Sequence, residues 1–284
     1  MAVVLITGAS RGIGMATALA FARAGDRVYA SMRDLSAAEP LQRAAESEKL
    51  EVNCIALDVT RPASFATVID TIVEAEGSLD ILVNNAAILS FGAFEDVRET
   101  ELRRVMETNF FGPALLTQSV LPQMRAQNSG YIIMLSSLSG VAARALDSVY
   151  AASKFALEGL TEGLRNEVAR WNIKTALIEP ALYATEIFNT VAGAPPVGSA
   201  YKALVEQHLN ELEAGAAQGR APSALADLIV NISRSDGSHF RWQPEEFAEG
   251  VVAKFLGLED GARSRLLREI SDVDWWIDGR ASPK

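Results

Sequence analysis

Residues 3–14 read Val3-Val4-Leu5-Ile6-Thr7-Gly8-Ala9-Ser10-Arg11-Gly12-Ile13-Gly14, a short apolar run that passes directly into a glycine-rich turn. The apolar spacing of a helix follows over Ile13–Ala24. Glycines at such a turn allow close backbone approaches that a Cβ would block, and the N–H groups at a helix start can hold a pyrophosphate. The stretch therefore predicts a buried first strand, a phosphate-binding loop and a helix.

The glycine spacing, G-x-x-x-G-x-G, differs from the commonest dinucleotide fingerprint, G-x-G-x-x-G. A plain tight turn is therefore the alternative interpretation. The position of the turn, between a first strand and a first helix, favours cofactor binding. The loop residues expected to bind the cofactor are Gly8, Ser10, Arg11, Gly12, Ile13 and Gly14.

Short apolar runs alternate with helical patterns along the first two thirds of the chain, which is typical of βαβ units. The runs lie at Val3–Thr7, Arg27–Met32, Val52–Leu57, Ile81–Asn84, Tyr131–Ser136 and Thr175–Glu179. Two long helical patterns cover Glu99–Arg125 and Val149–Trp171. Strands that are apolar on both faces belong in a parallel sheet covered by helices. We therefore predict an α/β fold, a doubly wound (Rossmann-like) parallel sheet whose ligand crevice lies at the carboxyl ends of its strands.

The pattern changes after about Thr185. Amphipathic patterns follow at Tyr201–Glu213 and Ala224–Ser233, and a helix start follows at Pro244. The acidic, tryptophan-bearing tail has no predicted role. We predict a single domain over residues 1–284, made of a dinucleotide-binding and catalytic core (1–185), a small helical cap over the crevice (186–243) and a C-terminal helix and tail (244–284).

Composition narrows the classes of partner. The chain has 284 residues, 49% of them apolar, and a formal net charge of −10. Nucleic acid and anionic membrane surfaces both favour clustered Lys and Arg, so neither is expected as a partner. No apolar stretch approaches the roughly 18 residues of a transmembrane helix. Cys54 is the single cysteine and lies far from His208 and His239, so we expect no disulfide, no metal site and a reducing cytoplasm.

The end of the second predicted strand, Ser31-Met32-Arg33-Asp34, bears on the choice of cofactor. An acidic side chain about 20 residues after the glycine loop holds the ribose hydroxyls of NAD, whereas arginine accommodates the 2′-phosphate of NADP. Arg33 and Arg11 are expected to form a cationic clamp for that phosphate. Asp34 is the competing signal, unless it caps the following segment. We predict NADP(H).

Tyr150 and Lys154 are four residues apart, so on a helix they share a face. A nearby ammonium favours phenolate and is expected to lower the pKa of Tyr150, which makes it a general acid in reduction and a general base in oxidation. Ser137 closes a strand thirteen residues before Tyr150, where its hydroxyl would bind the substrate oxygen. Ser136 and Ser139 are alternatives for that role.

Together, Thr7–Gly14, Asn84-Asn85-Ala86, Ser137 and Tyr150-Ala151-Ala152-Ser153-Lys154 resemble the motifs of the short-chain dehydrogenase/reductase family. The resemblance covers roughly residues 1–190, with all motifs in order. Val28–Leu35 and Val149–Gly159 are most similar to the branch that contains 17β-hydroxysteroid and retinol dehydrogenases.

The resemblance implies an enzyme that interconverts a carbonyl and an alcohol with NADP(H). Hydride passes between nicotinamide C4 and the carbonyl carbon, Tyr150 exchanges the proton of the oxygen, and Ser137 positions that oxygen. Lys154 also grips the nicotinamide ribose, and Asn109 completes a proton relay through water. The family's other cofactor contacts fall at Asp58 (adenine), Asn85 (adenosine ribose) and Thr185 (carboxamide), with Val59 and Pro180 beside the cofactor as well.

In this branch, Arg33 matches the arginine of NADP-preferring members, and Met32 takes the place where NAD-preferring members carry an acid. Two residues depart from the family pattern. Ala87 stands where the family has the glycine of Asn-Asn-Ala-Gly, and Ala181 where it has the glycine after Pro180. Alanine is tolerated at such positions if the backbone stays at negative φ.

The loops at the predicted crevice carry mostly apolar side chains, and no Arg or Lys is evidently placed to clamp a carboxylate or phosphate. We therefore predict a lipophilic or aromatic ketone, aldehyde or secondary alcohol as substrate, although the same residues would also serve simply to seal the core. Because the family usually pairs its two long helices between subunits, we predict a homodimer or homotetramer. The candidate pocket residues are Leu89, Phe91, Leu138, Ala143, Leu146, Leu182, Ile187 and Phe188.

Two functions of other classes are the alternatives. A nucleotide-sensing binding protein would keep the fold without turnover, but the presence of Asn109, Ser137, Tyr150 and Lys154 argues against it. An epimerase or dehydratase of nucleotide-linked sugars would usually show a larger C-terminal substrate domain and a clamp for the diphosphate. The chain shows neither.

Overall fold

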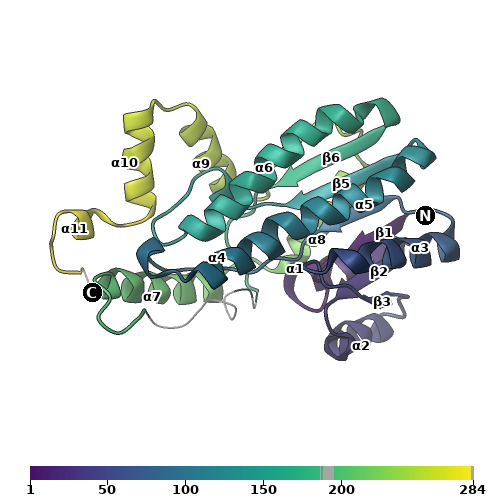
Figure 1. Ribbon diagram of the computed structural model, residues 1–284, viewed down its shortest axis with the longest axis horizontal. Helices are drawn as coiled ribbons and strands as arrows, with labels where there is room; N and C mark the ends of the chain where they lie inside the picture. The colour runs from purple at the N-terminus through teal and green to yellow at the C-terminus, as the bar shows by residue number, and fades with distance from the viewer. Residues whose placement is uncertain (186, 188–194, 283–284) are drawn as a thin grey trace.

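The computed structural model describes residues 1–185, 187 and 195–282 (Figure 1). The strands are β1 Val3–Ile6, β2 Arg27–Met32, β3 Asn53–Ala56, β4 Ile81–Asn84, β5 Gly130–Leu135, β6 Ile173–Ile178 and β7 Arg241–Trp242. The helices are α1 Gly12–Arg23, α2 Glu39–Ser47, α3 Phe65–Glu76, α4 Glu99–Met106, α5 Gly112–Gln127, α6 Ser148–Val168, α7 Lys202–Gln218, α8 Pro222–Arg234, α9 Glu246–Leu256, α10 Asp260–Ile270 and α11 Asp274–Ile277.

Seven of the described strands form one parallel sheet in the order β3-β2-β1-β4-β5-β6-β7. The order reverses between β1 and β4, which is where a doubly wound sheet opens a ligand crevice. All four residues of β1 are buried. Val4 and Ile6 pack into one hydrophobic cluster, and Val3 and Leu5 into another. The run is apolar throughout because both of its faces are covered, which confirms the predicted Rossmann-like fold.

The helices form a layer on each face of the sheet. Residues of α1, α2 and α8 pack in the cluster that contains Val4, and residues of α3, α5 and α6 pack in the cluster that contains Val3. Two of these helices end at a left-handed residue, α3 at Gly77 (φ +81°) and α5 at Asn128 (φ +50°).

The long helical pattern predicted over Glu99–Arg125 is interrupted. A π-helical turn at Glu107–Phe111 separates α4 from α5. A π turn adds one residue to the helical repeat, so it changes which side chains face inward. Here it contains Asn109, whose side chain is directed into the interior and is only 1% exposed.

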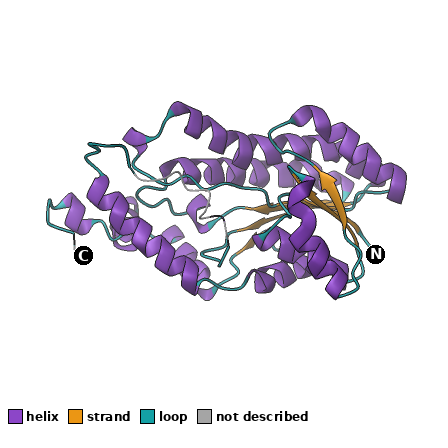
Figure 2. Cartoon of the chain, turned by 90° about the horizontal axis from the view of Figure 1, so that it is seen from below, coloured by secondary structure: helices purple, strands orange, loops and turns teal. Residues whose placement is uncertain are grey.

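The sheet and its helical layer extend beyond residue 185, into the range predicted as a cap. Within that range, α8 packs against α1, with Leu225 and Ile229 fully buried. The strand β7 pairs with β6 and adds an edge to the sheet. The sequence did not predict β7, because a strand of two residues is too short to show an alternation of apolar and polar side chains. The remaining predicted cap, α7, lies with α9, α10 and α11 beyond the carboxyl ends of the strands (Figure 1). Figure 2 shows the same end of the molecule, next to the C-terminus, as helices and loops without strands.

The tryptophan-bearing tail, which had no predicted role, closes the molecule at that end. Trp275 is 6% exposed and packs in a cluster with Leu204 and Leu212 of α7. The ring of Trp276 lies 5.9 Å from that of Tyr201. Among the helices that the structure describes, none combines the length and the apolar character that a membrane span requires.

We expect Ile229→Ala in α8 to lower the free energy of unfolding of the whole domain by about 3 kcal/mol, because it leaves a cavity in the main core. Leu256→Ala in α9 is the control, since Leu256 is 59% exposed and its loss should change stability by no more than about 0.5 kcal/mol. Urea denaturation measures both. A cap that folds separately would instead give Ile229→Ala an altered KM at unchanged stability.

Candidate active site

The glycines of the loop after β1 are required either by the backbone conformation or by close packing. Gly8 and Gly12 adopt positive φ (+67° and +57°), which disfavours any side chain. A Cβ on Gly14 would lie 2.3 Å from the carbonyl oxygen of Gly8, so the start of α1 lies directly against the loop. Asn85 braces the same turn from the end of β4, since its Nδ2 donates to the carbonyls of Thr7 (2.8 Å) and Gly8 (3.1 Å).

One cavity of about 410 Å³ runs from this loop past the carboxyl ends of the strands. Its volume is in the range of small-molecule and cofactor sites. Of the residues predicted for the site, Asn109 is not in its lining. The predicted residues that do line it are Gly8, Ser10, Arg11, Gly12, Ile13, Gly14, Arg33, Asp58, Val59, Asn85, Ser137, Tyr150, Lys154, Pro180 and Thr185.

The two charged residues that follow β2 have different surroundings. Arg33 lines the cavity together with Arg11 and Met32. Asp34 is outside the described lining, and its Oδ1 accepts the N–H of Ser36 at 2.9 Å as the cap of a short helical turn. That backbone hydrogen bond lowers the pKa of Asp34. Asp34 thus serves as a cap, the local role that the sequence left open.

The serines after β5 have separate tasks. Ser137 lines the cavity, and its Oγ accepts the N–H of Ser139 at 3.1 Å. The Oγ of Ser139 donates to Asp147 at 2.6 Å, so this hydroxyl is already engaged. Ser136 is 3% exposed and lies against Gly140. Ser136 and Ser139 line the cavity as well, but the hydrogen bond of Ser137 to Tyr150 lowers the pKa of the phenol. That bond favours Ser137 for the substrate oxygen, and its role stays a prediction.

Tyr150 and Lys154 are both buried on α6, at 8% and 2% exposure. Lys154 Nζ donates to the carbonyl of Leu135 at 2.7 Å and lies 5.6 Å from the centre of the Tyr150 ring. Burial lowers the pKa of Lys154 to about 8. Burial also raises the pKa of Tyr150 well above its ordinary value, and the carboxyl of Asp147 adds to that rise.

The fall in the Tyr150 pKa that the sequence predicted is therefore wrong for this structure. The physical reason is desolvation, which disfavours the charged form of both groups at once. The spacing of the two residues gave their shared helix face correctly but carried no information on burial.

The Asn109 carboxamide clamps the loop after β4 to α6. Its Oδ1 accepts the N–H of Ile88 and its Nδ2 donates to the carbonyl of the same residue, both at 2.9 Å. Nδ2 also lies 3.1 Å from the Oγ of Ser153, which in turn donates to the carbonyl of Tyr150 at 2.6 Å. Asn109 thus supports the helix that carries Tyr150, and its part in a proton relay stays a prediction.

The two alanines that replace family glycines are accommodated. Among the described non-glycine residues, positive φ occurs at Lys49, Asn128, Leu146, Asn172 and Asp272. Ala87 and Ala181 are not in that set, so both keep the negative φ that alanine tolerates.

The substrate end of the cavity agrees in part with the sequence. Ala143 and Leu146 are absent from the described lining, and Leu146 instead packs with Phe91 in the cluster that contains Leu204 of α7. Phe188 lies outside the described residues. The predicted pocket residues that line the cavity are Leu89, Phe91, Leu138, Leu182 and Ile187.

The sequence analysis missed two charged residues in the lining, Arg144 and Asp147. They lie 3.9 Å apart, and burial raises the pKa of Asp147 to about 6. Their position just before Tyr150 was an available signal. Phe247, Val251 and Ile270 of the C-terminal helices also line the cavity, and only the tertiary fold brings them there.

Comparison with known proteins agrees with these motifs. The family model described as short chain dehydrogenase matches residues 2–194. Retinol dehydrogenase 8 of Bos taurus is 38% identical over 261 residues, which cover 89% of this chain and 77% of the relative.

Two solved structures extend the comparison to the whole fold. A short-chain dehydrogenase from Streptomyces avermitilis is 32% identical with a TM-score of 0.78, covering 98% of this chain and 97% of the other. A metagenomic short-chain oxidoreductase in complex with NADP is 26% identical with a TM-score of 0.67, covering 85% and 94%. The chain therefore belongs to the short-chain dehydrogenase/reductase family of oxidoreductases, in a branch with the retinol dehydrogenases.

Proposed function

We propose that this protein is an NADP(H)-dependent enzyme that interconverts a lipophilic carbonyl compound and its alcohol. The observation that carries the proposal is the convergence of Ser137, Tyr150 and Lys154 on one cavity with the glycine loop and Arg33. A binding protein that had lost turnover would have no need of a buried phenol, ammonium and hydroxyl at the same point. The intact set therefore favours catalysis over nucleotide sensing.

The residues present fit a dinucleotide. Gly8 and Gly14 let the turn pack closely, since a Cβ on Gly8 would lie 2.8 Å from Ala86 Cα and one on Gly14 2.3 Å from the carbonyl oxygen of Gly8. Both glycines also line the cavity, where the N–H groups at the start of α1 would hold a pyrophosphate. Asp58 and Val59 lie in the lining for the adenine, and Pro180 and Thr185 for the other end. When bound, the nicotinamide supplies hydride to the carbonyl carbon or accepts it from the alcohol carbon.

Proton transfer falls to the chain's own residues. In reduction, the Tyr150 hydroxyl gives its proton to the substrate oxygen, and the Ser137 hydroxyl donates a hydrogen bond to that oxygen. The raised pKa of Tyr150 keeps the phenol protonated at neutral pH, which suits the role of acid. The Lys154 ammonium stabilises the phenolate that remains. In oxidation the same proton moves in the opposite direction.

The choice of NADP over NAD rests on the end of β2. Arg33 lines the cavity, where its guanidinium suits a phosphate through paired donors. Asp34, the residue that would hold ribose hydroxyls in an NAD enzyme, caps a helical turn instead. The metagenomic relative in complex with NADP is consistent with this choice.

The substrate class follows from the lining beyond Tyr150. Leu89, Phe91, Leu138 and Leu182 are apolar, which favours a lipophilic ketone or aldehyde. Retinol dehydrogenase 8, named for a lipophilic alcohol, supports the same class. The charges of Arg144 and Asp147 largely balance, so they favour neutral over anionic substrates.

We further propose that the protein assembles as a homodimer or homotetramer through α4, α5 and α6. Phe111 and Phe155 are 43% and 46% exposed on this layer, where aromatic side chains would be covered by a second copy. Light scattering should give a mass of two or four chains. A monomer at micromolar concentration would contradict this proposal and leave the reaction untouched.

Tyr150→Phe should lower kcat for carbonyl reduction by at least about 100-fold, because it removes the proton donor. The binding of NADPH, followed by fluorescence, should be largely unchanged. Tyr131→Phe is the matched control, since Tyr131 is a buried tyrosine on β5 that bonds Ser235 away from the cavity. NADPH consumption against a panel of ketones, aldehydes, steroids and retinoids measures the loss. Full activity in Tyr150→Phe would exclude the mechanism, and NADPH binding without turnover on any substrate would favour the binding-protein alternative.

Arg33→Ala should raise the Kd for NADPH by about 10- to 100-fold, since a charge-assisted hydrogen bond to phosphate contributes roughly 1.5–3 kcal/mol. The Kd for NADH should stay within about twofold, because NADH lacks the 2′-phosphate. Asp34→Ala is the control and should leave both cofactors nearly unaffected. Isothermal titration calorimetry measures the Kd of each cofactor for the unaltered protein and the two variants. Tighter binding of NADH than NADPH by the unaltered protein would reverse the proposed cofactor preference.

A further inference from the structure

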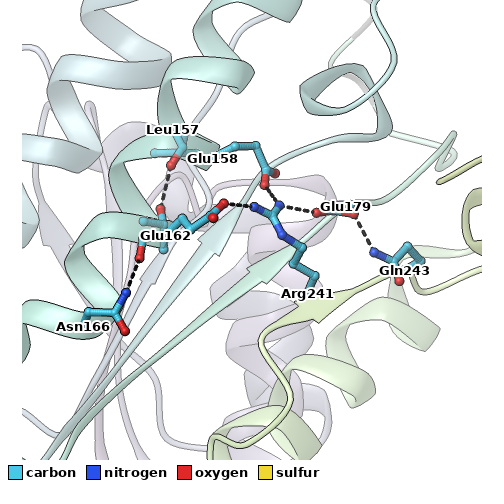
Figure 3. A network of polar contacts seen from close by, with 8 residues as sticks. Leu157, Glu158, Glu162, Asn166, Glu179, Arg241 and Gln243 are labelled. Carbon is cyan, nitrogen blue, oxygen red and sulfur yellow. Dashed lines mark hydrogen bonds and ion pairs between the residues drawn. The ribbon is translucent and has the colours of Figure 1, made fainter. Parts of the chain in front are cut away.

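An arginine on the edge strand contacts carboxylates from two elements of the active site (Figure 3). The Arg241 guanidinium on β7 donates to Glu158 of α6 and, at 2.9 Å, to Glu179 at the end of β6. A third bond of 2.6 Å reaches Glu162. The side chains of Glu158 and Glu179 are 7% and 0% exposed, whereas that of Glu162 is 66% exposed. Two of the three carboxylates are therefore buried.

Each buried carboxylate adjoins a residue of the catalytic site. Glu158 follows Lys154 by one helical turn, and its carboxylate opposes the fall in the Lys154 pKa that burial causes. Glu179 directly precedes Pro180 and accepts Gln243 Nε2 at 2.5 Å. The packing is close, since a Cβ on Gly140 would lie 2.7 Å from Ser136 Oγ and 3.3 Å from Glu158 Oε1.

Charge explains why an arginine occupies this position. Two neighbouring carboxyl groups in a buried site do not both ionise unless a cation compensates them. Burial raises the pKa of Glu158 to about 7, with a hydrogen bond from Ser136 opposing the rise, Glu179 adding to it and Arg241 opposing it. A guanidinium suits this task because it stays charged at every working pH and has several donors. Arg241 thus favours the ionised form of Glu158 above about pH 7, and without Arg241 the carboxyl would keep its proton to higher pH.

We propose that Arg241 is a positioning residue for the reaction, which keeps Glu158 ionised and thereby keeps Lys154 charged beside Tyr150. The proposal rests on the roles proposed above for Lys154 and Tyr150. Arg241 is not in the described lining of the cavity, so it would act only through Glu158. The titratable and charged groups that surround the Lys154–Glu158 pair in the described structure are Tyr150 and Glu162 on α6, Asp147 and Arg144 before it, Glu179 after β6 and Arg241 on β7.

The direction of the effect follows from these charges. Loss of Arg241 leaves Glu158 protonated, so the Lys154 ammonium loses the carboxylate that stabilises it. The pKa of Lys154, about 8 in the intact protein, then falls, and the ammonium is lost at lower pH. Because the ammonium is needed to stabilise the phenolate of Tyr150, the alkaline limb of the reduction profile moves toward lower pH.

The first test is the pH profile of kcat in Arg241→Met, Glu158→Gln and the double variant. Each single change should move the alkaline limb down by about one pH unit, a tenfold change in the ratio of ammonium to amine. The double variant should match Glu158→Gln alone, because Arg241 is proposed to act on Lys154 only through Glu158. Arg241→Lys keeps the cation and should leave the alkaline limb close to its position in the unaltered protein. Glu162→Gln is the control, since Glu162 contacts the same guanidinium but is exposed.

The second test does not depend on turnover. Lys154 is one of six lysines and lines the cavity, so competitive labelling with acetic anhydride followed by peptide mass spectrometry reports its ionisation directly. The labelling pKa of Lys154 should fall in Arg241→Met and in Glu158→Gln and stay unchanged in Glu162→Gln. If no substrate turns over, the proposed function fails while this test still stands.

Three outcomes would overturn the proposal. One is an unchanged labelling pKa of Lys154 in Glu158→Gln, a nearly isosteric change that serves even if Arg241→Met fails to fold. The second is an additive effect in the double variant, and the third is a kcat that falls equally at all pH values in Arg241→Met. Arg241 would then only fasten β7 to the sheet.

Discussion

The carboxyl ends of parallel strands must all lie on one edge of the sheet, and every functional group of this protein depends on that constraint. The glycine loop follows β1, Arg33 follows β2, Ser137 follows β5 and Pro180 follows β6. The crossovers that the parallel order requires fill the two faces, so the edge is the place where polar groups meet a cavity. The close contact of Gly14 with Gly8 belongs to the same constraint, because α1 has to begin directly at that edge.

The parts of the fold and site that sequence predicts are those encoded locally. Doubly covered strands are apolar on both faces, as β1 is, and a glycine at positive φ can be read from a turn motif, as at Gly8. The pair Tyr150 and Lys154 is likewise local, because four residues span one helical turn. Such features need no knowledge of what lies across the molecule, and the structure brings their side chains into one cavity.

The rest depends on contacts between distant segments. The strand β7 forms by pairing with the edge of β6, and α8 is part of the core because its apolar residues pack against those of α1. Phe247 lines the same cavity as the glycine loop, although the two lie far apart in the chain. The sign of the Tyr150 pKa shift has the same origin, because burial is a property of the whole fold. No periodicity or spacing in one segment records these contacts.

Burial gives this site a requirement that an exposed one would not have. A phenol and an ammonium that are both desolvated lose the water that would otherwise stabilise their charged forms, so fixed protein charges have to replace it. Within the described structure, Glu158 is the carboxylate that acts on Lys154, and it is itself buried. A buried carboxylate needs its own cation, and Arg241 on the edge strand meets water at 32% exposure. The Lys154 ammonium is therefore compensated by Glu158, and Glu158 by Arg241. The Arg241 guanidinium is partly exposed, so water stabilises its charge.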